Sequence, residues 1–153
     1  MTIEERLVEL GLELPPAPAP AANYATWVRA GDLFFLAGHI PNRPGGELAY
    51  RGKIGRDLTV EEGRAAARFV TLNLLATLRQ ALGSLDRVVQ VVKVTGFVNA
   101  EPEFAEQSQV LNGCSDLLVD VFGPRGRHAR SAVGVAGLPL NVPVEIELIA
   151  EVQ

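Results

Sequence analysis

The sequence predicts an α+β fold, in which two helices cover one face of a mostly β sheet. Strand-like segments begin and end the domain, and two segments with helical periodicity interrupt them. Helices placed in this way collect on one face of the sheet. The chain has 153 residues, of which 48% are hydrophobic, so it has enough material for one core but not for two.

Residues 1–22 are expected to lie outside this domain, which spans residues 23–153. The N-terminal segment begins with apolar residues at helical spacing, which predict a short amphipathic helix: Ile3, Leu7 and Leu10. Gly11 would end this helix, and the prolines after it exclude regular structure, so we expect an extended arm. Glutamates among the first ten residues argue against a secretory signal peptide.

The domain itself is expected to open with two strands, residues 24–29 and 33–37, separated by a turn at Gly31 and Asp32. Residues 41–57 are rich in glycine, proline and charge, which predicts a loop. The first part of the domain therefore supplies a pair of strands followed by a long connection.

The clearest single element is a helix that begins after Thr59. Thr59 and Glu62 stand three residues apart, as in a capping box, and Gly83 suits the position just after the last helical turn. Apolar residues between these limits fall on one stripe: Phe69, Leu72, Leu75, Leu78 and Leu82. The pattern predicts a helix of about six turns that buries this stripe.

The second half of the chain predicts a strand over 87–98, a helix over 102–122, and two strands over 129–136 and 144–152. If residues 137–142 connect the last two strands directly, these strands form a hairpin.

In the first of these two strands, Val133 and Val135 share one face and Arg130 lies on the other. If the helices cover the valines, then Arg130 shares the open face with the glutamates of the last strand, including Glu145. That face either meets water or receives a ligand or a neighbouring subunit, and small residues favour close approach there: Ala132, Gly134 and Ala136. The hairpin would separate Arg130 and Glu145 by about 13 Å, so we expect one small ligand to need a site completed across a subunit interface.

These same residues carry a resemblance to a known family. The segments ARSAVGVA (129–136), LP (138–139) and VEIE (144–147) resemble the C-terminal signature of the Rid/YjgF family. Upstream, AGHIP (37–41) is similar to the Ser-Gly-Gln-Ile-Pro motif of that family. The resemblance covers the chain from about residue 20 to its end.

The resemblance implies a chorismate-mutase-like α+β fold, a homotrimer, and clefts between neighbouring subunits. It also implies hydrolytic deamination of enamines or imines such as 2-aminoacrylate to 2-keto acids and ammonia, without metal or cofactor. By this resemblance Arg130 would bind the substrate carboxylate through its planar fork of donors, and Glu145 would hold and polarise the attacking water.

Four further positions match the site by resemblance. The backbone near Gly38 would bind substrate, Tyr24 and Asn112 would shape the cleft, and His39 lies in the same motif as a candidate lining residue. Ala132 stands where many members have a cysteine, so a thiol role is absent there. Ala37 and His39 replace the family's usual Ser and Gln beside Gly38, and these departures bear on the substrate more than on the fold.

Two other functions are compatible with the same sequence. The first is a non-catalytic module that binds a small carboxylate metabolite in the same cleft. The second is a ribonuclease, as some members of the family have been assigned, although a net charge of −4 and dispersed basic residues argue against nucleic-acid binding.

The sequence further predicts a cytoplasmic protein that needs no cofactor and no membrane. No apolar run approaches the ~20 residues that span a bilayer. His39 and His128 lack partners at ligand spacing, so no metal site is expected. The single cysteine, Cys114, excludes an intramolecular disulfide and is expected to be a small buried residue.

Overall fold

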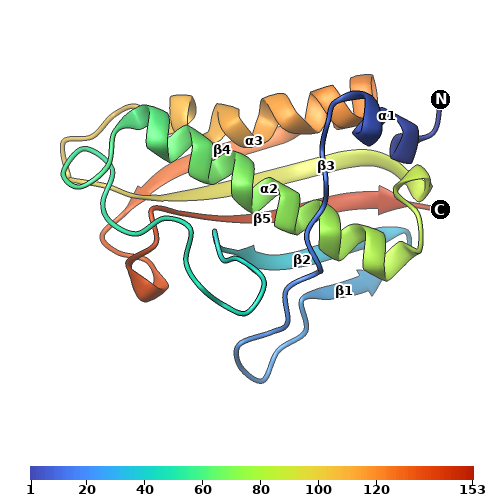
Figure 1. Ribbon diagram of the computed structural model, residues 1–153, viewed down its shortest axis with the longest axis horizontal. Helices are drawn as coiled ribbons and strands as arrows, with labels where there is room; N and C mark the ends of the chain where they lie inside the picture. Colours follow the sequence, from blue (N-terminus) through green and yellow to red (C-terminus); the bar gives the residue numbers. More distant parts are fainter.

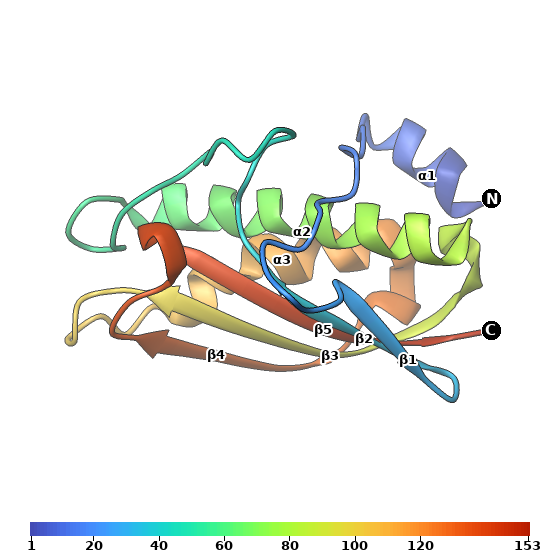
Figure 2. The same cartoon turned by 90° about the horizontal axis from the view of Figure 1, so that it is seen from below.

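The computed structural model describes residues 1–153 as a five-stranded sheet with helices on one side (Figures 1 and 2). The elements follow this order: α1 (Ile3–Glu9), β1 (Trp27–Ala30), β2 (Leu33–His39), α2 (Val60–Leu82), β3 (Val88–Asn99), α3 (Gln107–Phe122), β4 (Ala129–Val135) and β5 (Val144–Val152). The strands are arranged in space as β1-β2-β5-β3-β4. In Figure 2, α2 and α3 cover one face and leave the other open, which confirms the predicted α+β class with two helices on one face.

The helix α2 has the predicted ends. The Glu62 N–H donates to Thr59 Oγ1 and the Thr59 N–H donates to the Glu62 carboxylate, both at 3.1 Å, and Gly83 adopts a left-handed φ of 80°. The buried face is rotated from the predicted stripe, because Phe69 and Leu72 are only half-buried. The residues that face the core are smaller on average and let the helix approach the sheet closely: Ala66, Ala67, Val70, Leu74, Leu75 and Leu78.

The second long helix, α3, begins five residues later than predicted and ends where expected, before Gly123. The segment that precedes it forms a turn, in which the Phe104 N–H donates to the Glu101 carbonyl at 3.0 Å. Within α3, Gly113 packs against α2 so closely that a Cβ would overlap the Arg64 carbonyl oxygen. Glycine at this position therefore sets the distance between the two helices.

The predicted hairpin between the last two strands is wrong. β3 lies between β4 and β5, with β4 parallel to it and β5 antiparallel to it. The reason is the crossover: α3 carries the chain from the end of β3 back to its start, so the next strand runs in the same direction. β5 then enters on the other side of β3 and joins it to β2.

The assignment of faces in β4 is also wrong. Val133 is 43% exposed on the open face, whereas Ala132 packs against the core. A Cβ on Gly134 would stand 3.0 Å from Nε2 of Gln107 in α3, so this residue also faces the helix. The small residues of β4 therefore allow α3 to lie close to the strand, and Arg130 shares their side.

The N-terminal segment is attached to the domain. α1 has the predicted helical form, with the Ile3 N–H donating to Asp86 Oδ1 at 2.8 Å and Arg6 Nε donating to the Asp120 carbonyl at 2.8 Å. The arm then passes over α2 to β1 (Figures 1 and 2). None of the helices combines the length and the apolar composition needed to cross a membrane.

Apolar side chains line part of the open face of the sheet. Val28, Phe35 and Ile149 pair in register across β1, β2 and β5. Val28 and Phe35 are 57% and 41% exposed. A contiguous apolar row on a sheet surface is typical of a surface that binds another chain or a ligand.

Candidate functional site

The first cluster of predicted site residues forms where β2 bends next to β5. The pairing of β2 with β5 shifts register between Leu36 and His39, so Gly38 sits in a bulge. A Cβ on Gly38 would overlap the Glu145 carboxylate and lie 2.9 Å from its Cδ. Because Gly38 has no side chain, the Glu145 carboxylate occupies the space above the bulge.

Glu145 is half-buried and has no hydrogen-bond or ion-pair partner for its carboxylate within the chain. Burial raises the pKa of Glu145 above its usual range, and the like charge of Glu147 on the same face raises it further. A carboxylate with a raised pKa and free oxygens is suited to accept a proton and return it.

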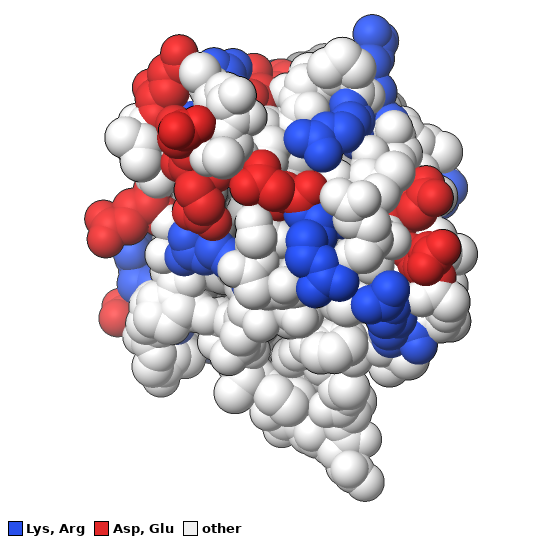
Figure 3. Space-filling model, turned by 90° about the vertical axis from the view of Figure 1, so that its right-hand side faces the viewer, with Lys and Arg blue, Asp and Glu red and all other residues white.

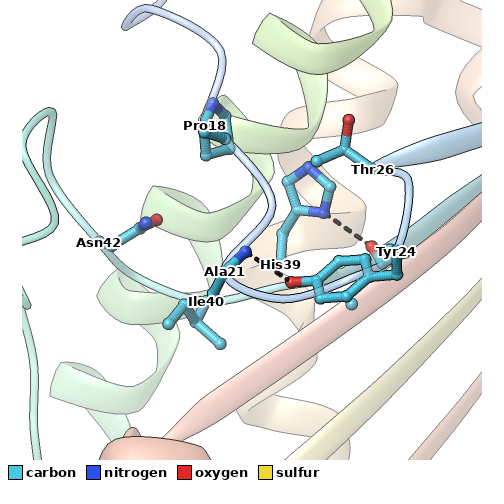
Figure 4. Close-up of a pocket in the computed structure, with 10 residues that line it drawn as sticks. Pro18, Ala21, Tyr24, Thr26, His39, Ile40 and Asn42 are labelled. Atoms are coloured by element: carbon cyan, nitrogen blue, oxygen red, sulfur yellow. Dashed lines mark hydrogen bonds between the residues drawn. The ribbon is translucent and has the colours of Figure 1, made fainter.

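A small pocket, open to solvent, lies beside this bulge (Figure 4). Tyr24, Gly38 and His39 line it, together with Pro18 and Ala21 of the N-terminal arm. The Tyr24 hydroxyl accepts a hydrogen bond from the Ala21 N–H at 3.4 Å, which ties the ring to the arm. The arm lies outside the part of the sequence that carries the family resemblance, so its contribution to the pocket could not be predicted from the motifs.

His39 lies on the helix side of this pocket and its side chain is buried. Nδ1 lies 2.7 Å from the Ala37 carbonyl and Nε2 lies 2.8 Å from Thr77 Oγ1 in α2. Burial lowers the pKa of His39, although the hydrogen bond to Ala37 partly opposes this effect. Both ring nitrogens are therefore used within the chain, and His39 supports the bulge from beneath.

The second cluster is centred on Arg130 in β4. Its Nη1 donates to Asn112 Oδ1 at 2.9 Å and to Ser115 Oγ at 3.1 Å. Asn112 and Ser115 are three residues apart on α3, so both side chains lie on the helix face that packs against β4. Arg130 is half-buried and forms no ion pair with a carboxylate, which leaves its positive charge available to an anionic ligand.

Two members of this second cluster were missed by the sequence interpretation. Ser115 Oγ lies 2.9 Å from His128 Nε2, and His128 Nδ1 lies 2.6 Å from the Gly126 carbonyl. The spacing of Asn112 and Ser115 on a helix was visible in the sequence, but it has meaning only if Arg130 faces that helix. The wrong face assignment for β4 concealed it.

One chain does not bring the two clusters together. Arg130 pairs with Val94 and Glu145 pairs with Phe97, three residues further along β3. Three residues along the strand and two strand spacings across it separate their Cα atoms by about 14 Å. Arg130 also faces α3 whereas Glu145 faces the open side, so the prediction that they share a face is wrong.

Other reactive side chains lie apart from both clusters. Cys114 is fully buried, and burial raises the pKa of its thiol to about 11, against weaker opposing effects of Thr71 and Arg130. A thiol with such a pKa is a poor nucleophile at neutral pH. Nowhere do three His, Cys, Asp or Glu side chains gather as metal ligands would.

Comparison with known proteins shows a match along nearly the whole chain. Residues 4–152 match the family described as "YjgF/chorismate mutase-like, putative endoribonuclease". Protein TCP17 of Trypanosoma cruzi is 48% identical over 151 residues, which are 97% of this chain and 93% of that protein.

Solved structures agree with this match. The crystal structure of a "putative endoribonuclease" from Shewanella oneidensis is 40% identical, with a TM-score of 0.95, and the alignment covers 99% of this chain and 100% of that one. The crystal structure of E. coli TdcF with bound serine is 27% identical, with a TM-score of 0.63, covering 92% and 94% of the two chains.

Proposed function

The chain belongs to the YjgF/Rid family, and from this membership and the two charged clusters we propose that it is a hydrolytic deaminase of small imino or enamino acids. The products are a 2-keto acid and ammonia. The observation that carries the proposal is the pair of unpartnered charges: a half-buried guanidinium without a carboxylate at Arg130, and a half-buried carboxylate without a cation at Glu145.

The complete site lies between two subunits of a homotrimer. Since the two clusters occupy opposite faces of one chain, the Arg130 cluster of one subunit meets the Glu145 cluster of the next. The exposed apolar row of Val28, Phe35 and Ile149 supports self-association through the open face of the sheet.

The chemistry needs few groups because an imine carbon is already electrophilic. The fork of Arg130 binds the substrate carboxylate and orients the C=N bond. Glu145 removes a proton from water as the water oxygen bonds to the imine carbon, and returns this proton to the nitrogen, which gives a carbinolamine. Glu145 then transfers the hydroxyl proton to the nitrogen, so that the C–N bond breaks as the C=O bond forms and ammonia leaves. An enamine such as 2-aminoacrylate first takes a proton on its terminal carbon and loses one from its nitrogen to become the imine.

The class of ligand has independent support from a structural relative. TdcF, described with bound serine, holds a small molecule that carries an α-carboxylate and an amino nitrogen. An imino acid has the same two groups on one carbon, so a site of this kind accommodates it.

The test is hydrolysis of freshly generated 2-aminoacrylate and a panel of imino acids, with wild type beside Arg130→Ala. We expect ammonia release above the uncatalysed rate. In the variant this release should fall about 100-fold or more, because the ion pair between the Arg130 guanidinium and the substrate carboxylate is lost. Glu103→Gln, an exposed change outside both clusters, is the matched control for handling and folding. No acceleration by folded wild-type protein across the panel would favour the non-catalytic binding module.

The names of several relatives raise ribonuclease activity as a second candidate. On the face that Figure 3 shows, Lys and Arg side chains are interspersed with Asp and Glu and form no continuous basic surface. The net charge of −4 also opposes binding of a polyanion. Salt-dependent binding of a labelled RNA would support this candidate, and its absence at low salt would remove it.

A further inference from the structure

The polar contacts of Arg130 continue beyond Ser115 in a series of hydrogen bonds whose donors and acceptors can be assigned from their chemistry. His128 Nδ1 lies 2.6 Å from the Gly126 carbonyl, which can only accept, so Nδ1 carries a proton. In the neutral ring Nε2 is then an acceptor, and it receives the Ser115 hydroxyl proton at 2.9 Å. With its proton committed to His128, Ser115 Oγ presents lone pairs to Arg130 Nη1 at 3.1 Å.

The surroundings of His128 favour the neutral ring that this chain requires. Burial lowers the pKa of His128; the hydrogen bond to Gly126 opposes this, and the positive charge of Arg130 lowers the pKa further. Arg125 donates to the Val88 carbonyl and Lys93 donates to Ser131 Oγ, so neither of these cations hydrogen-bonds in the chain of contacts around His128. No carboxylate forms an ion pair with His128.

These contacts use one end of the guanidinium and leave the other end open. Nη1 has two protons, and Asn112 and Ser115 accept one each. Nε and Nη2 have no hydrogen-bond partner in the chain, and together they form the side of the guanidinium that binds a carboxylate through two parallel bonds. The chain of contacts thus fixes the plane of the fork without occupying its binding edge.

We propose that Ser115 and His128 are positioning residues, which hold the Arg130 guanidinium in the orientation that receives a substrate carboxylate. This inference rests on the proposed function, because it assumes that Arg130 binds the carboxylate. It adds two residues that lie outside the segments that carry the family resemblance.

The local sequence makes the arrangement possible. A Cβ on Gly126 would lie 3.0 Å from Val119 Cα and overlap the Leu118 carbonyl of α3. The turn before β4 therefore approaches α3 only because residue 126 is glycine. His128, two residues later, is brought against Ser115 by this approach.

Matched pairs of variants test the proposal in the full-length protein. Ser115→Ala removes the hydroxyl and Ser115→Thr retains it; His128→Leu removes the acceptor and His128→Gln retains one at similar reach. We expect the Kd for 2-oxobutyrate, measured by calorimetry, to rise about three- to tenfold in Ser115→Ala and His128→Leu, the scale of one hydrogen bond. The retaining variants should bind within about twofold of wild type.

Binding of 2-butanone, which lacks the carboxylate, should be equally weak in all variants. Equal affinity of wild type and Arg130→Ala for 2-oxobutyrate would overturn the proposed function, and this inference with it. A large loss in Arg130→Ala, with wild-type affinity in Ser115→Ala and His128→Leu, would overturn the inference alone.

A second measurement does not depend on any ligand. Nitrogen-15 NMR detects the Arg130 side-chain N–H groups as sharp signals when hydrogen bonds hold them. We expect these signals in wild type, Ser115→Thr and His128→Gln, and their broadening in Ser115→Ala and His128→Leu. Sharp signals in all five proteins would contradict a positioning role.

Discussion

The Arg130 cluster and the Glu145 cluster differ in how the chain surrounds the charged group. In the first, one end of the charged group is held within the chain: Asn112 and Ser115 accept hydrogen bonds from Nη1 of Arg130, and His128 holds Ser115. In the second, the carboxylate has no polar partner and stands in the space that Gly38 leaves empty. A group that binds substrate gains from being held in place, whereas a group that exchanges protons gains from a raised pKa and free oxygens.

The largest expected effect follows from a substitution of Glu145 in the second cluster. We expect Glu145→Gln to lower kcat about 100- to 10,000-fold, the usual contribution of a general acid–base group. Since the raised pKa means that the ionised form is disfavoured in the folded state, the neutral amide should leave stability at pH 7 unchanged or higher. Kinetics and urea unfolding at fixed protein concentration measure both quantities. Retained kcat in the variant would show that another group activates the water.

An assembly that mixes two variants tests whether a single site takes Arg130 from one subunit and Glu145 from another. Arg130→Ala and Glu145→Gln, each expected to be inactive alone, are co-expressed with different tags and the doubly tagged assemblies are isolated. In the proposed trimer, an assembly with both kinds of subunit has one intact site in three, so we expect about a third of wild-type activity to return. If both groups of a site came from one chain, no activity would return.

The Gly38 bulge is the next place to change the second cluster alone. A methyl at residue 38 would overlap the Glu145 carboxylate, which is the mobile end of a side chain and can swing away. We expect Gly38→Ala to fold with near wild-type stability and to lose about 10- to 100-fold in kcat. The reason is that the displaced Glu145 carboxylate is no longer in position to take a proton from the attacking water. Gly137→Ala, where a Cβ meets nothing within 4 Å, is the matched control. Equal activity of the two variants would contradict a role for this close approach.

Local patterns predicted the elements of this molecule well, and long-range pairing poorly. The capping box of Thr59 and Glu62 and the glycine at 83 set the limits of α2 from neighbouring residues alone. The order of strands depends on how α3 crosses from β3 to β4, which no local pattern records. The adjacency of the last two strands in the sequence therefore predicts a hairpin, although β3 separates them in the sheet.

The candidate site was predictable to the same extent. Motif resemblance identified Arg130, Glu145 and Gly38, because short segments carry them. It could not assign them to faces, since the valines of β4 turn outward and its small residues turn toward α3. Ser115 and His128 became visible only when that orientation was known.

The smallest expected effect concerns His39, which supports the Gly38 bulge from the buried side. Burial lowers its pKa in the folded state, so the unfolded chain takes up a proton first as the pH falls below about 6.5. Stability from the neutral ring is thus complete above that pH and declines below it.

We expect His39→Gln to unfold more easily at pH 7.5, by about 1–3 kcal/mol, because Thr77 loses its partner. The further decline between pH 7.5 and 5.5, measured by urea unfolding, should be smaller than in wild type. His128→Gln, measured in parallel, separates the contribution of the other, half-buried histidine, whose pKa is also lowered. An equal decline in wild type and His39→Gln would mean that His39 titrates alike in both states and that the bulge does not depend on a neutral ring.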